Sequence, residues 1–221
     1  MKKINKNDKI LDIELKIKNN EEFMKKVILA ILIMVLIYSV GGIYYIKYVY
    51  KDNNEPVVRN LDVIEGYSYS LKSNASLLYK DEFNKLKDNL EGNYSEEEYI
   101  NSICKLYIID LYSLNYKLNK YDVNTEFIYP DVVSNYKLNI ENTLYKYLED
   151  NSDGERSQEL PIVTSVIIDE VSDDVYSLNN EEVSCKKVKV TISYDNDLGY
   201  DKSGVITLVK VDKYYYIVEY N

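Results

Sequence analysis

One carboxylate in this 221-residue chain stands where a catalytic base could act. Asp110 falls within the run from Tyr99 to Leu118, which is apolar over most of the circumference of a helix. A carboxyl group withheld from water has a raised pKa, which suits a group that removes a proton from a substrate. Spacing fixes neither Asp122 nor Glu126 as a partner. We therefore favour a structural interpretation, in which Asp110 lies on the narrow polar face or bonds to a nearby hydroxyl or amide.

A second candidate is a calcium site at an acidic turn. Asp195, Asp197 and Asp201 surround Gly199, and calcium prefers oxygen ligands such as carboxylates. Their spacing places glycine where the calcium-loop pattern needs a ligand, whereas a hairpin turn uses Asp and Gly for conformational reasons. The acidic stretch 150–155 matches the pattern less well still. We predict no metal site and no cofactor.

Histidine is absent, which removes the commonest metal ligand and the usual general base near neutral pH. The two cysteines, Cys104 and Cys185, fall in a predicted helix and a predicted strand. A disulfide between them suits an extracytoplasmic location, and two buried free thiols fit the sequence at least as well. We assign no catalytic residue and do not expect an enzyme.

An apolar segment near the N-terminus determines where these groups are located. Twenty uncharged residues, 27–46, lie between the pair Lys25 and Lys26 and the single Lys47. At ~1.5 Å per helical residue they reach ~30 Å, the thickness of the hydrocarbon core of a bilayer. We predict a transmembrane helix over residues 27–47 that anchors the chain in the lipid bilayer.

The charges beside this segment predict its orientation. Residues 1–26 carry eight lysines and five acidic residues, whereas Lys47 and Lys51 on the other side are followed by Asp52 and Glu55. A lysine excess next to a span favours the cytoplasmic side. We expect a single-pass protein of the cell membrane, with its N-terminus in the cytoplasm and its C-terminal domain outside.

A cleaved secretory signal is the alternative. Ser39, Val40 and Gly41 place small residues at a spacing that a signal peptidase accepts. However, the segment before the span is long and carries five acidic residues, and the apolar run continues through residues 43–46. We therefore favour an uncleaved signal-anchor.

The span divides the chain into four predicted parts: a cytoplasmic tail over 1–26, the transmembrane helix over 27–47, a linker over 48–58 and an extracytoplasmic domain over 59–221. The whole chain has a net charge of −10, and subtracting the +3 of the tail leaves −13 for the remainder. A strongly acidic domain repels nucleic acid and anionic lipid. No nucleic-acid partner is expected.

The tail contains a short alternating pattern. Leu11, Ile13, Leu15 and Ile17 alternate with charged residues, which is the periodicity of a strand. A strand without a sheet of its own could pair with the sheet edge of a cytoplasmic partner. A disordered tail and a helix lying on the membrane are the alternatives.

Helices precede strands in the long outer segment. Ser73 or Asn74 can cap the first helix, and Ser95 with Glu98 forms a capping box for the second. The predicted order is a strand over 63–71, helices over 73–90, 95–118 and 131–149 with an extended stretch at 126–129, and strands over 160–169, 182–194, 204–211 and 214–220. This order predicts an α+β fold in which about three helices pack on one face of a curved C-terminal antiparallel sheet.

One span followed by a short strand, three helices and an antiparallel sheet resembles the nuclear-transport-factor-like cone fold. More specifically, it resembles the outer domain of the bitopic scaffold proteins of type IV secretion and conjugation machines. The resemblance covers most of the chain and rests on the order and length of the elements. It implies a cone-like domain, and it does not by itself transmit function.

Two shorter segments carry a closer resemblance: 109–117 with the following Asp122-Val123 pair, and 142–147. They resemble uncharacterised single-pass membrane-anchored proteins of AT-rich Gram-positive bacteria. Such proteins place glycines after the Asp-Val pair, where this chain has Asn124 and Thr125, so a tight turn is not implied here. This resemblance brings no known activity.

Together these features favour a non-enzymatic, membrane-anchored scaffold or interaction protein in a secretion, conjugation or cell-envelope assembly. Its expected partner is another protein or a second copy of the chain. The alternative is a domain that binds a small ligand or transfers a proton, with Asp110 as the base. A pocket of several hundred cubic ångströms with converging polar groups would favour the alternative, and a filled interior would favour the scaffold.

Overall fold

The computed structural model describes residues 6–44 and 58–221. The chain forms two compact units, Met1–Glu55 and Pro56–Asn221. Positions 45–47 of the predicted span and 48–57 of the predicted linker lie outside the described residues. The sequence-based boundaries of the tail, span, linker and outer domain therefore stay predictions.

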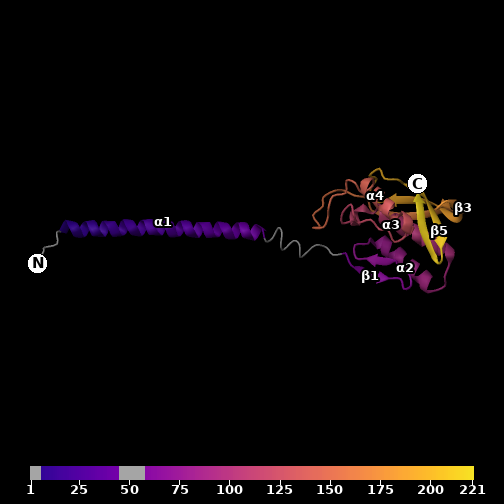
Figure 1. Ribbon diagram of the computed structural model, residues 1–221, viewed down its shortest axis with the longest axis horizontal. Helices are drawn as coiled ribbons and strands as arrows, with labels where there is room; N and C mark the ends of the chain where they lie inside the picture. Colours follow the sequence, from indigo (N-terminus) through magenta and orange to yellow (C-terminus); the bar gives the residue numbers. More distant parts are fainter. Residues whose placement is uncertain (1–5, 45–57) are drawn as a thin grey trace. The chain divides into compact units, whose positions relative to one another are not determined.

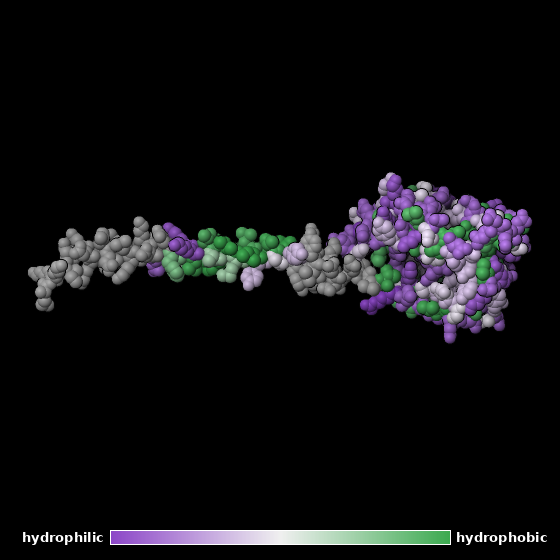
Figure 2. All heavy atoms as spheres, viewed as in Figure 1, coloured by the Kyte–Doolittle hydropathy of each residue, from purple (hydrophilic) through white to green (hydrophobic). Residues whose placement is uncertain are grey.

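The first unit contains one long helix, α1 (Lys6–Tyr44) (Figure 1). Its segment Phe23–Tyr44 is 22 residues long, apolar and exposed. Figure 2 shows the apolar side chains of this segment, in contrast to the mostly hydrophilic visible face of the second unit. At ~1.5 Å per residue the segment reaches ~33 Å, which is long enough to cross a bilayer core. Its orientation stays a prediction.

The alternating segment 11–18 of the tail belongs to α1, so the strand prediction is wrong. Eight alternating residues are a short pattern, and a lone strand leaves its backbone N–H and C=O groups unpaired. A helix satisfies these groups within the segment itself. Among the described residues of the tail there is no strand to offer to a partner.

The second unit begins with a hairpin, β1 (Asn60–Val63) and β2 (Ser70–Lys72), rather than with the single strand predicted over 63–71. Gly66 has a φ of +73°, a conformation that glycine adopts at little cost, and the chain reverses there. The alternating apolar residues continue across this turn, which is why the pattern alone indicated one strand.

Two helices follow, α2 (Leu77–Glu91) and α3 (Glu96–Tyr112). Each begins with a serine whose hydroxyl accepts a backbone hydrogen bond. Ser76 caps α2 at 3.1 Å, and Ser95 caps α3, where it accepts from the N–H of Glu98 at 3.4 Å. The predicted cap at Ser95 is confirmed, but its own N–H donates to Oδ1 of Asn89 at 2.7 Å, so the reciprocal bond of a capping box with Glu98 is not made. The predicted cap of α2 at Ser73 or Asn74 is wrong, because Ser76 caps this helix.

The central helix α3 is apolar on nearly all sides, as its sequence predicted. Eleven of its 17 residues are buried. They are Tyr99, Ile100, Ser102, Ile103, Cys104, Leu106, Tyr107, Ile108, Ile109, Leu111 and Tyr112. A helix of this kind must be enclosed by the rest of the domain.

α3 ends at Tyr112, earlier than the predicted end at residue 118, and a short 3₁₀ helix, η2 (Leu114–Tyr116), follows. The carbonyl oxygens of this region are held by one guanidinium, that of Arg156. It donates to the carbonyl oxygens of Leu114, Asn115, Lys117 and Glu149 at 2.8–3.3 Å. One guanidinium thus satisfies several backbone acceptors of the irregular segments on either side of it.

The helix predicted over 131–149 is shorter in the structure. A 3₁₀ helix, η3 (Pro130–Val132), leads into α4 (Val133–Asn142). Tyr145 is fully buried, and its hydroxyl donates to the carbonyl oxygen of Leu111 at 2.9 Å. α4 ends before this buried side chain. Tertiary packing of this kind overrides helix propensity, and hydrophobic spacing in the sequence does not reveal it.

The four-stranded antiparallel sheet predicted at the C-terminus is present, in the order β3-β4-β5-β6. Its strands are β3 (Val163–Leu178), β4 (Glu181–Tyr194), β5 (Ser203–Val211) and β6 (Tyr214–Tyr220). β3 continues past its predicted end at residue 169. Asn179 and Asn180 then turn the chain with φ values of +53° and +66°, as a tight two-residue hairpin requires.

α3 lies beside the strands of this sheet (Figure 1). One hydrophobic core joins the helix to the inner face of the sheet. The sheet contributes alternate residues, as half-buried strands do. These residues are Val188, Val190 and Ile192 on β4, Ile206 and Leu208 on β5, and Tyr215 and Ile217 on β6. The described chain is therefore a mixed helix and sheet fold with its functional candidates at the ends and edges of this core.

Replacing Arg156 with alanine should lower the free energy of unfolding by about 2–4 kcal/mol, because several carbonyl oxygens lose a charged donor. Arg156→Lys should recover less than half of this loss, since an ammonium cannot reproduce the planar fork of a guanidinium. Urea denaturation of the full chain in detergent micelles, followed by tyrosine fluorescence, measures both. Wild-type stability in Arg156→Ala would contradict this role.

Candidate functional site

Asp110, in the last turn of α3, has a partner that spacing did not indicate. The Nζ of Lys117 lies 2.6 Å from the Oδ2 of Asp110. The side chain of Lys117 is only 5% exposed, and that of Asp110 is 21% exposed. A buried ammonium needs a counter-charge because its own hydration is lost. The carboxylate of Asp110 is thus held in an ion pair.

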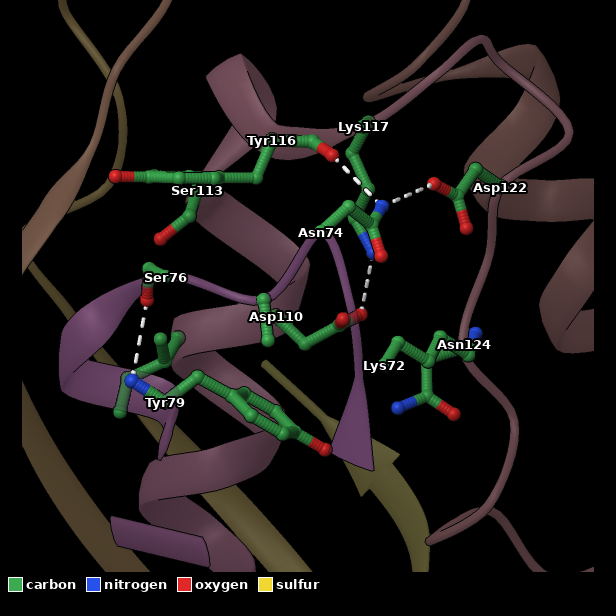
Figure 3. Close-up of a pocket in the computed structure, with 12 residues that line it drawn as sticks. Lys72, Asn74, Ser76, Tyr79, Asp110, Ser113, Tyr116, Lys117, Asp122 and Asn124 are labelled. Carbon is green, nitrogen blue, oxygen red and sulfur yellow. Dashed lines mark hydrogen bonds and ion pairs between the residues drawn. The ribbon is translucent and has the colours of Figure 1, made fainter. Parts of the chain in front are cut away.

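A cavity of about 30 Å³ lies beside this pair (Figure 3). Also at this cavity, the side-chain amide of Asn74 donates to the carbonyl oxygen of Tyr116 at 2.9 Å and to Oδ2 of Asp122 at 3.3 Å. The N–H of Leu118 donates to the same oxygen of Asp122 at 3.1 Å. A water molecule needs ~10–15 Å³ of such space, so the cavity has room for one or two.

Glu126 is the third carboxylate of this region. The N–H of Ser70 donates to one of its oxygens at 3.1 Å, and the Ser70 hydroxyl donates to the other. Burial raises the pKa of Glu126, and the hydrogen bonds from Ser70 act in the opposite direction. Burial also raises the pKa of Tyr79, and the negative charges of Asp110 and Glu126 raise it further.

This geometry suits a structural polar cluster. Small-molecule sites usually occupy ~300–1,000 Å³, at least ten times the volume beside Asp110. Asp110, Asp122 and Glu126 are each bound by their own donors, and none of them faces another as an acid and base pair would. Proton transfer on a substrate by Asp110 would require the cavity to open and the lysine to withdraw.

The aspartates of the predicted acidic turn do not converge on one point. Asp197 pairs with Lys202 at 2.7 Å. Asp201 accepts from the hydroxyl of Tyr112 at 3.3 Å, and Asp195 accepts a backbone N–H at 2.9 Å. Throughout residues 6–44 and 58–221, no group of three His, Cys, Asp or Glu side chains could hold a metal ion.

The acidic stretch 150–155 is organised by local turns. Asp150 accepts from the N–H of Ser152 at 2.7 Å, and Asp153 accepts from the N–H of Glu155 at 3.3 Å. Aspartate is common in turns because its side chain can accept a hydrogen bond from the backbone N–H two residues further along.

Cys104 and Cys185 are both buried and both free thiols. The sequence allowed either a disulfide or two free thiols, and the structure shows two free thiols. Burial raises the pKa of each thiol, in the case of Cys104 inside α3 and in the case of Cys185 on β4. Reactive cysteines have a lowered pKa instead, so neither thiol has the character of a nucleophile.

Two wider grooves lie on the second unit. One, of about 410 Å³, runs between α4 and β6 and is lined mainly by tyrosine and aliphatic side chains. We call it the α4–β6 groove. The other, of about 500 Å³, lies between α2 and α3 and is lined by charged and amide side chains. There the buried Glu82 accepts from Ser102 at 3.2 Å and pairs with Lys85 at 3.1 Å, which gives it the character of a structural ion cluster.

The sequence did not identify Lys117 or the α4–β6 groove. Asp110 and Lys117 are seven residues apart, a spacing that puts two residues near one face of a continuous helix, and the early end of α3 changed that geometry. Asn135 and Asn139 line the groove at a spacing of four on α4. Polar residues at that spacing could have been noticed in the sequence, although nothing in it says that they face a strand edge.

Removing the charge of Asp110 should destabilise the domain, because the ammonium of Lys117 stays buried without a counter-charge. Asp110→Asn should lower the free energy of unfolding by about 1–3 kcal/mol. The double variant Asp110→Asn/Lys117→Met should lose less than the sum of the two single variants, as measured by urea denaturation. Strict additivity would contradict a stabilising pair.

The raised pKa of Glu126 gives a second prediction. In the unfolded chain this carboxyl ionises at its ordinary, lower pKa, so burial penalises the folded state increasingly as pH rises through the folded pKa. Glu126→Gln should therefore gain stability over the wild type at pH 7, and this advantage should shrink towards pH 4. The exposed Glu155→Gln is the matched control. A difference independent of pH would refute the buried-charge cost.

Comparison with known proteins adds no family. No family model, no curated protein and no solved structure matches this chain. The resemblance to cone-fold scaffold proteins and to membrane-anchored proteins of Gram-positive bacteria therefore stays a prediction from the sequence. Function has to be inferred from the residues of this chain and their geometry.

Proposed function

We propose that this chain is a single-pass membrane protein whose outer domain, residues 59–221, is a non-enzymatic scaffold or interaction module. The observation that carries the proposal is the state of its most enzyme-like group. Asp110 is paired with Lys117 beside a cavity of about 30 Å³, so the interior is filled where a proton-transfer site would need space. Binding to a partner requires no reactive group.

The location proposed for the domain follows from charge. Phe23–Tyr44 supplies the apolar helix, and the lysine-rich residues 1–26 stay on the cytoplasmic side. Residues 59–221 then lie outside the cell membrane, in an acidic domain that does not bind nucleic acid. The packing of α3 on one face of the C-terminal sheet is compatible with the proposed cone-like fold. The place that we propose for the protein, in a secretion, conjugation or cell-envelope assembly, rests on the resemblance of its sequence.

Binding of a small ligand is the second candidate, because the α4–β6 groove has the volume of a ligand site. The groove shares no lining residue with the Asp110 cavity. A ligand there would have no access to Asp110 as a base. Because the groove and Asp110 are separate, a ligand in the groove would be bound without being changed chemically by Asp110.

Affinity purification of the full chain from its native membrane tests the proposal. We expect a protein to co-purify with the wild type and equally with Asp110→Asn, and not with a variant that ends at residue 57. Equal capture by all three would place the interaction in the tail or span instead of the outer domain. A measurable turnover that Asp110→Asn abolishes without loss of folded protein would contradict a non-enzymatic function.

A further inference from the structure

The last strand of the sheet, β6, has an edge that the chain itself covers only in part. The N–H of Ile217 donates to the carbonyl oxygen of Phe127 at 2.7 Å, and the N–H of Tyr129 donates to the carbonyl oxygen of Ile217 at 3.0 Å. Residue Ile128 thus forms a parallel bridge with Ile217. At Pro130 the chain leaves the sheet for η3, so this parallel ladder stops after one rung.

The edge beyond that rung is open. Asn221 and Val205 exchange two backbone hydrogen bonds, at 2.7 and 3.1 Å. Antiparallel pairs alternate between bonded and non-bonded positions, so the next residue, Tyr220, opposite Ile206, turns its N–H and C=O away from β5. Neither group of Tyr220 bonds to a described residue. A strand edge of this kind can pair with another segment.

The α4–β6 groove runs along this open edge, and Figure 1 shows the C-terminus beside α4. Its floor is aromatic: the rings of Tyr107 and Tyr220 lie 5.7 Å apart, and those of Tyr107 and Tyr136 lie 6.3 Å apart. Its outer wall carries Asn135 and Asn139, whose exposed amides make no hydrogen bond to other described side chains or backbone. Each amide offers both a donor and an acceptor.

We propose that the α4–β6 groove binds an extended, basic peptide segment of a partner protein as an added strand on β6. The segment would continue the parallel ladder that residues 127–129 begin, with its inner backbone edge on Tyr220 and its outer edge on the amides of Asn135 and Asn139. Alternate side chains would reach the tyrosine floor. This proposal rests on the proposed function and specifies how the outer domain holds its partner.

Charge distinguishes such a peptide from a second copy of the chain. The residues after the tail carry a net charge of −13, so two copies repel each other while a lysine- or arginine-bearing segment is attracted. Glu219, beside Tyr220, is exposed and forms no ion pair with any residue of the described parts. The open edge is also short and bordered by α4, which suits one strand better than a whole domain.

Selection of peptides on the full chain tests the groove. A phage-displayed library of random heptapeptides is panned on the chain in lipid nanodiscs, with empty nanodiscs as counter-selection. We expect recovered peptides that combine Lys or Arg with aromatic or aliphatic residues. Their Kd should rise at least tenfold in Asn135→Ala/Asn139→Ala and rise with salt, and they should slow hydrogen exchange at the Tyr220 amide.

Ser134→Ala/Leu138→Ala is the matched control, because it changes two exposed residues of α4 at the same spacing that do not line the groove. It should leave the Kd unchanged. The proposal would be overturned if no peptide is recovered, or if the peptides bind Asn135→Ala/Asn139→Ala as tightly as the wild type. It would also be overturned if the chain associates with itself and Asn135→Ala/Asn139→Ala abolishes that association. If a partner protein still co-purifies through the outer domain, such a result rejects the groove and leaves the proposed function standing.

Discussion

The second unit is organised by one constraint: α3 is apolar on almost every side and must be enclosed. Eleven of its residues are buried, and the sheet, α2 and the segment around Tyr145 supply the enclosing surfaces. Burial of the apolar side chains of this helix favours folding, since apolar area removed from water contributes ~25 cal/mol per Å². The other features of the domain follow from where this helix begins, ends and carries polar groups.

At the end of α3, polar and charged groups lie in or next to the apolar interior and need partners there. Asp110 and Lys117 neutralise each other there, and Arg156 binds carbonyl oxygens of the segment that follows the helix. A carboxylate on an apolar helix can be a catalytic base or one half of a structural ion pair, and the groups that it contacts distinguish the two. In this chain the partner is a buried lysine, and the volume left beside the pair suits water.

Periodicity and capping predicted the elements that depend on local chemistry. The cap at Ser95, the buried circumference of α3, the strand content of the C-terminal third and the apolar helix near the N-terminus all follow from residues close in sequence. Features decided by distant contacts were not predictable in this way. The chain after α3 is held by Arg156, more than thirty residues further along, and the short α4 is followed by the buried Tyr145. The α4–β6 groove is formed by two elements that are far apart in the sequence.

The central claim, that an apolar helix holds the acidic domain on the outer side of the membrane, is tested most directly by adding protease to intact cells that carry the chain with a C-terminal tag. The account predicts that the cell-associated tag is digested while a cytoplasmic control protein stays whole. A tag that survives in intact cells and is digested only after lysis would contradict the claim, and so would a tagged domain found free in the medium.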